Sequence, residues 1–181
     1  MFKKIALVVV VLIGAVLVYA ATRPDALHVE RVASIKAPSD RIFPLINDFH
    51  RWGAWSPYEK VDPAMKRTYS GSAQGKGAVY EWAGNSQVGR GRMEITDTSD
   101  PSRVTIKLDF SAPLEGHDVA VFTLVPQGDS TNVTWTMDGP TPYIGKLIGV
   151  FMNMDTMIGT QFETGLASLK AIAEKNDGGS R

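Results

Sequence analysis

The stretch TNVTWTMDGPTPYIGKLIGVFMNMDTMIGTQFETGLASLKAIAEK, residues 131–175, changes its hydrophobic period midway. Up to Asp138, apolar and polar residues alternate, as in a β-strand with one buried face. From residue 144 onward the apolar residues follow three-and-four spacing, which is typical of helices. We expect a short helix at 142–152 and a long one from about 154. A long helix with an apolar stripe needs a second layer, such as a sheet, to cover it.

Strand-like segments separated by turn residues precede this helix. The first strand is expected at 28–36, followed by a short helix at 39–47 with Ser39 as its N-cap and a helical turn at 49–54. Further strands are expected at 65–70, 77–83, 87–97, 103–111, 117–126 and 131–138. The connections are too short for crossover helices, so the strands should form an antiparallel meander. This order predicts an α+β fold in which a curved antiparallel sheet wraps around the long C-terminal helix.

The N-terminus carries an uncharged apolar segment. Ile5–Ala21 holds seventeen residues without a charge and follows Lys3 and Lys4. At about 1.5 Å per residue, a helix of this length spans roughly 25 Å, near the lower limit for crossing a bilayer. We expect an uncleaved transmembrane anchor, because the apolar core of a signal peptide is usually only about 7–15 residues long. The alternative is a signal peptide cleaved after Val18-Tyr19-Ala20, which would make the protein secreted.

Both alternatives place the bulk of the chain on the far side of the membrane. The positive-inside rule keeps Lys3 and Lys4 in the cytoplasm and exports the C-terminal part to the periplasmic or extracellular face. An uncleaved segment makes the protein a single-pass protein of the inner (cytoplasmic) membrane. We therefore expect an anchor and tether at 1–27, one domain at 28–176 and a flexible tail at 177–181.

The charge and cysteine content argue against several classes of function. The 19 Lys and Arg residues balance 19 Asp and Glu residues, which argues against a nucleic-acid-binding protein. Residues 1–27 hold three cations and one anion, so the rest of the chain carries a surplus of two negative charges. The chain has no cysteine, which excludes disulfides, a thiolate nucleophile and Cys-ligated metals. The three histidines are far apart in sequence, and we expect no metal site and no cofactor.

Several segments together are similar to one protein superfamily. They are Ile35–Phe43, Ile46–Phe49, Trp52–Pro57, Gly75–Trp82 and Gly159–Leu166. From residue 28 to about 175 the chain resembles the START-like superfamily, also called SRPBCC or polyketide cyclase/dehydrase and lipid-transport proteins. The resemblance implies a helix-grip fold with an apolar cavity between the sheet and the C-terminal helix. The superfamily includes binding proteins, lipid carriers, cyclases and co-chaperone-like domains, and no motif of this sequence matches a catalytic set.

Large apolar side chains are the candidates for the wall of such a cavity. They are Trp52, Trp55, Tyr80, Trp82, Met93, Phe110, Trp135, Met137, Met154 and Phe162. Ligand pockets are lined mostly by apolar and aromatic side chains, with few polar groups. The same residue types also fill an ordinary core, and methionine serves both purposes. Both interpretations stay open from the sequence.

Acid–base chemistry has one weak candidate, Asp155. It lies on or beside the apolar stripe of the C-terminal helix, where burial in a cavity would raise its pKa. The alternative is a water-exposed aspartate at the beginning of that helix. His117 and Asp118 are adjacent on a strand and therefore point to opposite faces, which excludes them as a dyad.

These observations favour a membrane-anchored domain that binds a hydrophobic or amphipathic small molecule, lipids included, with membrane contact through Ile5–Ala21. The first alternative is an enzyme like the polyketide cyclases and dehydratases, with Asp155 or Tyr80 as acid or base. The second is a non-catalytic interaction module of the cell envelope with a closed cavity. Such a module would expose a large apolar patch on the helix or on Trp52–Pro57. The sequence identifies neither the ligand nor the oligomeric state.

Overall fold

The computed structural model describes residues 2–175, so the expected tail at 177–181 lies outside the described residues. The strands are β1 (Ala26–Ile35), β2 (Lys66–Gly71), β3 (Ala78–Ala83), β4 (Arg90–Ser99), β5 (Arg103–Ala112), β6 (Gly116–Gln127) and β7 (Ser130–Pro140). The helices are α1 (Phe2–Ala21), α2 (Ser39–Asn47), the 3₁₀ turn η1 (Phe49–Arg51), α3 (Trp52–Trp55), α4 (Tyr58–Val61), α5 (Tyr143–Phe151) and α6 (Met154–Lys175).

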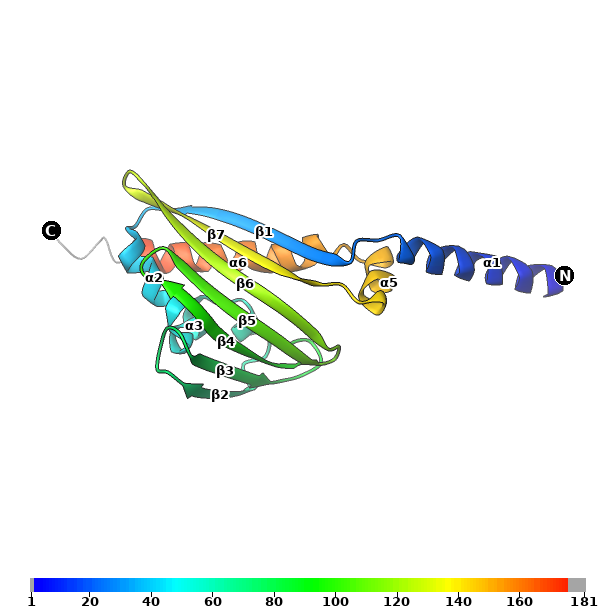
Figure 1. The fold of residues 1–181 in the computed structure, drawn as a ribbon, viewed down its shortest axis with the longest axis horizontal. Coiled ribbons are helices and arrows are strands. Elements are labelled where there is room, and N and C mark those ends of the chain that lie inside the picture. Colours follow the sequence, from blue (N-terminus) through cyan, green and yellow to red (C-terminus); the bar gives the residue numbers. More distant parts are fainter. Residues whose placement is uncertain (1, 176–181) are drawn as a thin grey trace.

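The strands form one antiparallel sheet in the order β1-β7-β6-β5-β4-β3-β2. Strands β2 to β7 follow one another as a meander, and β1 joins the free edge of β7 in the register Val29↔Met137. The curved sheet wraps around α6, which lies along its inner face (Figure 1). The predicted α+β helix-grip fold is confirmed.

Alternation along the strands decides which face of the sheet is buried. On β7, Val133, Trp135 and Met137 are buried on the inner face. The helical period of α6 turns Phe162 and Leu169 toward the same face, and both are buried. The apolar residues of both elements therefore meet in one core, as their two hydrophobic periods predict.

The connection between β1 and β2 differs from the expectation in two details. Ser39 begins α2 but does not cap it, since Pro38 occupies the N-cap position and no side chain caps the helix. The Ser39 hydroxyl lies 3.4 Å from the hydroxyl of Thr131 at the start of β7, which donates to the carbonyl of Ala37 at 2.7 Å. The short helix α4 is a further element that the sequence pattern does not predict.

Helix α1 extends away from the sheet and contacts the domain through α5 (Figure 1). Among the helices of residues 2–175, α1 alone is long and apolar enough to cross a membrane, and a signal sequence would have the same composition. Its end is fixed by two polar contacts. The Tyr143 hydroxyl donates to the Leu17 carbonyl at 2.9 Å, and the Lys146 ammonium pairs with Asp25 in the connection to β1.

Candidate ligand-binding face

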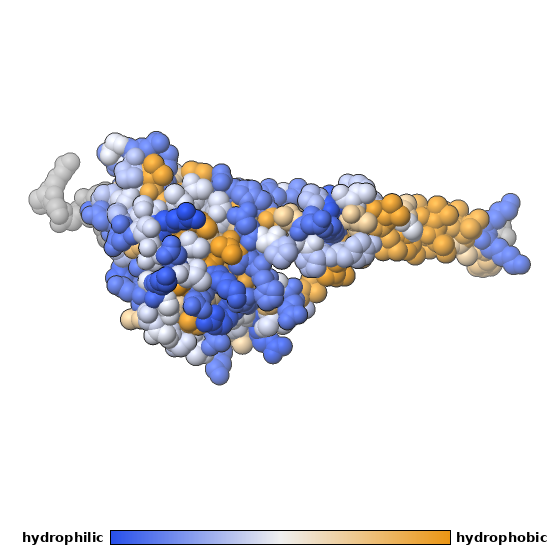
Figure 2. Space-filling view, viewed as in Figure 1, coloured by the Kyte–Doolittle hydropathy of each residue, from blue (hydrophilic) through white to orange (hydrophobic). Residues whose placement is uncertain are grey.

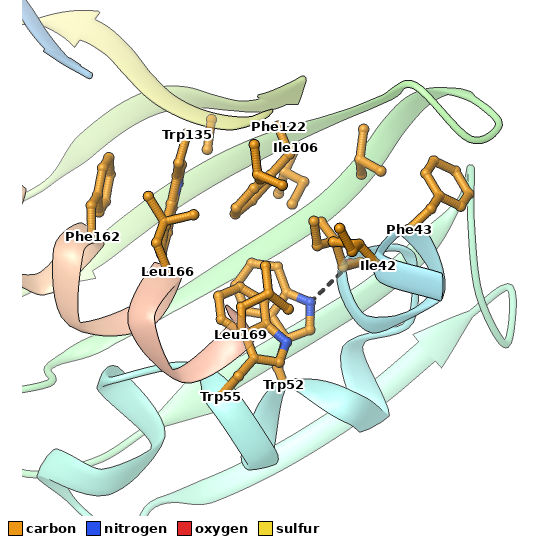
Figure 3. Packing of buried hydrophobic residues seen from close by; sticks show 14 of the residues in the cluster. Ile42, Phe43, Trp52, Trp55, Ile106, Phe122, Trp135, Phe162, Leu166 and Leu169 are labelled. Atoms are coloured by element: carbon orange, nitrogen blue, oxygen red, sulfur yellow. Dashed lines mark hydrogen bonds between the residues drawn. The ribbon is translucent and has the colours of Figure 1, made fainter. Parts of the chain in front are cut away.

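The centre of the space between the sheet and α6 is filled by aromatic rings (Figure 3). Trp135 of β7 stacks on Phe162 of α6 with ring centroids 3.9 Å apart. Phe122 lies 4.7 Å from Trp135, and Trp55 packs edge-on at 5.8 Å. Side chains from the sheet, from α6 and from α3 thus interlock here, and the centre of the space between the sheet and α6 is a packed core.

The helical segment η1–α3 fixes the other side of this cluster. The indole N–H of Trp52 donates to the Ile46 carbonyl at 2.9 Å, and that of Trp55 donates to the Leu45 carbonyl at 2.8 Å. Both indoles are buried with their polar group satisfied, which is how tryptophan is accommodated in a core. Ser56 and Pro57 are buried as well. The segment Trp52–Pro57 therefore presents no exposed patch of tryptophans.

The ten candidate residues fall into two groups. Seven are buried: Trp52, Trp55, Tyr80, Met93, Trp135, Met137 and Phe162. Three are partly exposed: Trp82, Phe110 and Met154. Trp82 and Phe110 lie together with ring centroids 5.7 Å apart, while Met154 begins α6 elsewhere. The sequence pattern does not distinguish the two groups, because exposure depends on how far α6 and α3 cover each strand.

Trp82 and Phe110 mark an open end of the inner face. Strand β4 has Gly91 between them, in register with both. A Cβ on Gly91 would lie 2.5 Å from the Trp82 ring, so the indole rests directly on the glycine backbone. The Trp82 N–H donates to the Val88 carbonyl at 2.9 Å, which holds the ring in this orientation. With Leu108, which is also partly exposed, these rings form a fixed apolar surface that water reaches.

Asp118 is the acidic residue of this open end, and nothing in the local sequence pattern indicates a role for it. It lies opposite Leu108 on β5. It is two residues before the buried Ala120 on β6, so its side chain is on the same, inner face of the sheet. A Cβ on Gly139 of β7 would fall 1.6 Å from a carboxylate oxygen of Asp118, so the carboxylate crosses the inner face into the space left by the glycine. Burial raises the pKa of Asp118. His117, on the opposite face, pairs with Asp109 at 2.7 Å.

Asp155 lies at the surface and is paired with an arginine, whereas an acid in a cavity would be buried. Its side chain is 54% exposed and pairs with Arg31 of β1, Nη2 to Oδ2 at 3.0 Å. The hydrogen bond from the Arg31 guanidinium lowers the pKa of Asp155, opposite to the raised value that a buried acid would have. Asn153 caps α6 instead, since its Oδ1 accepts from the Thr156 N–H at 3.0 Å. Asp155 therefore fixes β1 to α6 through Arg31.

Tyr80 is held in a buried polar network. Its hydroxyl donates to Glu59 Oε1 at 2.5 Å, and Arg67 Nε donates to Oε2 of the same carboxylate at 2.6 Å. Burial, and then the hydrogen bond to Glu59, raise the pKa of Tyr80. A phenol that is kept neutral and already donates to a carboxylate is not available as a base.

Two surface hollows lie outside the ten candidates. One, of about 150 Å³, is lined by Phe49, His50, Tyr69, Ser70, Gly71, Ser72, Ala73, Ala78 and Val79. The other, of about 420 Å³, is lined by Pro38, Ser39, Asp40, Pro101, Pro126, Gly128, Asp129, Ser130 and Thr131. Within residues 2–175, no three His, Asp or Glu side chains gather as they would around a metal ion.

Solved structures with the same architecture place the fold in the START-like helix-grip class. The chain is 17% identical to the major latex-like protein 151 of Panax ginseng, covering 83% of this chain and 99% of that one, with a TM-score of 0.59. The Aha1 dimer of Colwellia psychrerythraea matches at 16% identity, 82% and 96% coverage and a TM-score of 0.58. Protein CV1439 of Chromobacterium violaceum matches at 16% identity, 84% and 99% coverage and a TM-score of 0.57.

The family follows from the sequence match. Residues 26–174 match the family described as polyketide cyclase/dehydrase and lipid transport, and the chain belongs to that family. No curated protein matches the chain significantly. The matched residues begin with β1 and end in α6, so α1 lies outside the family's domain.

Proposed function

We propose that this protein is a membrane-anchored member of its family that binds a hydrophobic or amphipathic small molecule at the open end of the inner face. The observation that carries the proposal is the partly exposed apolar surface of Trp82, Phe110 and Leu108, beside an otherwise packed core. Apolar surface that water reaches on a concave face is a common feature of ligand sites. Its two aromatic rings are held in place before any ligand arrives, which lowers the entropy lost on binding.

Asp118 supports an amphipathic rather than a purely apolar ligand. Among the described residues, its carboxylate has no hydrogen-bond or ion-pair partner, although it is half-buried. A half-buried carboxylate without a partner has lost much of its hydration, so a hydroxyl or ammonium group on a ligand would stabilise it. The ligand would then lie with its apolar part on Trp82 and Phe110 and its polar donor toward Asp118.

Helix α1 supports a location at the membrane. It has twenty residues, its side chains are almost entirely exposed, and its apolar composition is suited to a lipid surrounding. With Lys3 and Lys4 in the cytoplasm, the domain is exported. Alkaline extraction of membranes and protease treatment of spheroplasts test both statements: the full-length chain should stay with the membrane and lose its domain to external protease. A soluble, shortened chain would instead mean a cleaved signal peptide.

Ligand binding is tested on the full chain by native mass spectrometry and by solvent extraction of the purified protein. The informative pair is Phe110→Glu and Ser111→Glu, which add the same charge at adjacent positions on opposite faces of β5. We expect the wild type and Ser111→Glu to retain an apolar molecule and Phe110→Glu to lose it. Lipid held only by α1 would be retained equally by all three proteins, so equal retention would contradict the proposed site. A wild type that retains and accepts no apolar molecule would contradict binding altogether.

A cyclase-like or dehydratase-like activity is the second candidate, and Asp118 is the observation that favours it. A carboxyl with a raised pKa beside a ligand surface is able to act as a general acid or base. Asp118→Asn separates the two functions. Turnover of an extracted ligand by the wild type but not by Asp118→Asn, with retained binding, supports an enzyme, while unchanged ligand in both supports a binding protein.

A further inference from the structure

Helix α5 and the segment that follows it expose apolar side chains at the end of the domain where α1 enters. Tyr143, Ile144 and Phe151 of α5, with Met152 and Met157, are between 44% and 75% exposed. The space-filling view shows apolar surface at this end of the domain, close to the apolar surface of α1 (Figure 2). Exposed apolar patches on a soluble domain commonly mark an interaction surface.

The orientation of α5 is the reverse of that of a helix facing water. Its one charged residue, Lys146, is buried and pairs with Asp25 of the tether. Ile144 and Phe151, two turns apart, are exposed on the other side, with Phe151 at 75%. A surface helix in water places its charges outward and its apolar residues inward. The arrangement therefore suits an apolar occupant outside the protein.

The position of α5 along α1 identifies that occupant. The Tyr143 hydroxyl donates to the Leu17 carbonyl at 2.9 Å, and Leu17 lies within the apolar segment Ile5–Ala21. Four residues of helix separate Leu17 from the end of α1, a rise of about 6 Å. If α1 spans a bilayer, the beginning of α5 lies at the same depth in the membrane as the last helical turn of α1. A helix at this depth is surrounded by lipid.

We propose that α5, together with Met152 and Met157, lies in the bilayer interface and seats the domain on the membrane surface. The inference rests on the proposed membrane location of α1. Interfacial helices immerse their apolar face by about 5–10 Å at the boundary between headgroups and acyl chains. Tyr143 has the amphipathic ring that membrane–water interfaces favour, and the unbranched side chains of Met152 and Met157 adapt to a fluid surrounding.

This seating directs the open end of the inner face toward lipid. Strand β7 carries Gly139, beside which Asp118 lies, and ends at Pro140, three residues before α5 begins. Asp118 lies opposite Leu108 and against Gly139, so the apolar surface of Leu108, Phe110 and Trp82 borders the end of β7 that leads into α5. An amphipathic ligand would enter from the membrane and not from bulk water.

Site-directed spin labelling tests the proposal on the full chain, because the natural sequence has no cysteine to compete with an introduced one. Phe151→Cys reports on α5, Met152→Cys on the residue that follows it, and Val11→Cys on α1. Val125→Cys, an exposed position of β6 near the opposite end of the sheet, reports on the aqueous side. Each labelled protein is reconstituted into vesicles of phosphatidylcholine and phosphatidylglycerol. The accessibility of each label to oxygen and to a nickel chelate gives its depth.

We expect the labels at Phe151 and Met152 to be more accessible to oxygen than to nickel, like the label at Val11, and the label at Val125 to show the reverse. If the labels at 151 and 152 are accessible to nickel while the label at Val11 is embedded in lipid, the inference about α5 is wrong, but α1 is still a membrane anchor. A nickel-accessible Val11 would overturn both. If the label at 151 is accessible neither to oxygen nor to the nickel chelate, and its spectrum shows dipolar broadening, a second copy of the chain covers the surface. That result would also overturn the proposal.

Discussion

The ring of Phe162 on α6 lies flat against the indole of Trp135 on β7, at an interplanar angle of 7°. Phe162 is 1% exposed and Trp135 is 3% exposed, so the pair closes the space between helix and sheet at its centre. The sheet therefore holds α6 here by direct contact between the two rings, and the partly exposed apolar surface of Trp82 and Phe110 lies away from this centre.

Removing this ring should be strongly destabilising. Phe162→Ala leaves a cavity against a rigid indole, and we expect the free energy of unfolding to fall by about 3–5 kcal/mol. Urea denaturation of the detergent-solubilised full chain, followed by tryptophan fluorescence, measures this change. Thr164→Ala, two residues away on the exposed side of α6, should change stability by at most about 0.5 kcal/mol. Similar effects for the two variants would mean that the centre of the grip is not closely packed.

Two buried glycines of α6 should respond differently to the same substitution. A Cβ on Gly165 would lie 2.9 Å from the Trp135 ring and 3.0 Å from Pro57, neither of which can move freely, so Gly165→Ala should cost about 1–3 kcal/mol. The atoms nearest to a Cβ on Gly159 would belong to the Arg31 guanidinium, the end of a side chain that can move by giving up its contacts with Asp155 and Glu163. For Gly159→Ala, the gain in helix propensity of about 1 kcal/mol should offset most of that displacement. Thermal unfolding of the two variants measures the difference, and a more destabilising Gly159→Ala would contradict the packing described for Gly165.

The contact of Arg31 with Asp155 should be visible in titrations. Arg31→Gln removes the hydrogen bond that lowers the pKa of Asp155, so this pKa should rise toward the ordinary value of about 3.9. Because the folded-state pKa is lowered, the contact stabilises the fold above the ordinary pKa, and this contribution is lost as the pH falls through the folded-state value. The stability difference between wild type and Arg31→Gln should therefore shrink in acid. NMR titration of the side-chain carboxyls measures the pKa itself.

Asp109 is the internal control for that titration. Its pKa is lowered by hydrogen bonds from His117 and Lys107 on the other face of the sheet, and Arg31→Gln should leave it low. A shift of both aspartates would indicate a general loss of structure instead of a lost contact.

Asp118 should show the opposite dependence on pH. Its pKa is raised by burial, so ionisation costs stability as the pH rises from the ordinary value through the folded-state one. Asp118→Asn, which cannot ionise, should be as stable as the wild type in acid and more stable at neutral pH. Denaturation curves at the two pH values test this. A variant that is less stable at neutral pH would show that the carboxylate has a stabilising partner.

The network around Glu59 should stabilise the edge of the sheet. Tyr80→Phe removes a hydrogen bond to a carboxylate that is 8% exposed, and we expect a loss of about 1.5–3 kcal/mol. Tyr69→Phe is the matched control, because Tyr69 packs on the Tyr80 ring but makes no hydrogen bond through its hydroxyl among the described residues. Equal losses in urea denaturation would mean that the two variants act through ring packing.

The sequence was sufficient to predict the layers of this fold, because those depend on local periods. Alternation located the buried faces of β5 and β7, and three-and-four spacing located α5 and α6. Short-range patterns made Asp155 a candidate for a cavity acid, whereas its partner Arg31, which keeps it at the surface, is 124 residues away in the chain.

The open end of the inner face could not be predicted in the same way. The position of Asp118 depends on a glycine, Gly139, that the register between β6 and β7 brings beside it. The difference between buried Trp135 and partly exposed Trp82 depends on where α6 lies over the sheet. Both facts concern pairs of distant residues, and residue types alone do not encode them.

The connection between α1 and β1 consists of residues 22–25. Four extended residues reach at most about 14 Å, roughly half the thickness of a bilayer's hydrocarbon core. If α1 is in a membrane, a connection this short keeps the domain at the membrane surface, so the domain cannot move a bound ligand across an aqueous compartment. With α1 in a membrane, whatever the domain binds is collected and delivered within that radius, and transport over a longer distance requires a partner that comes to the surface.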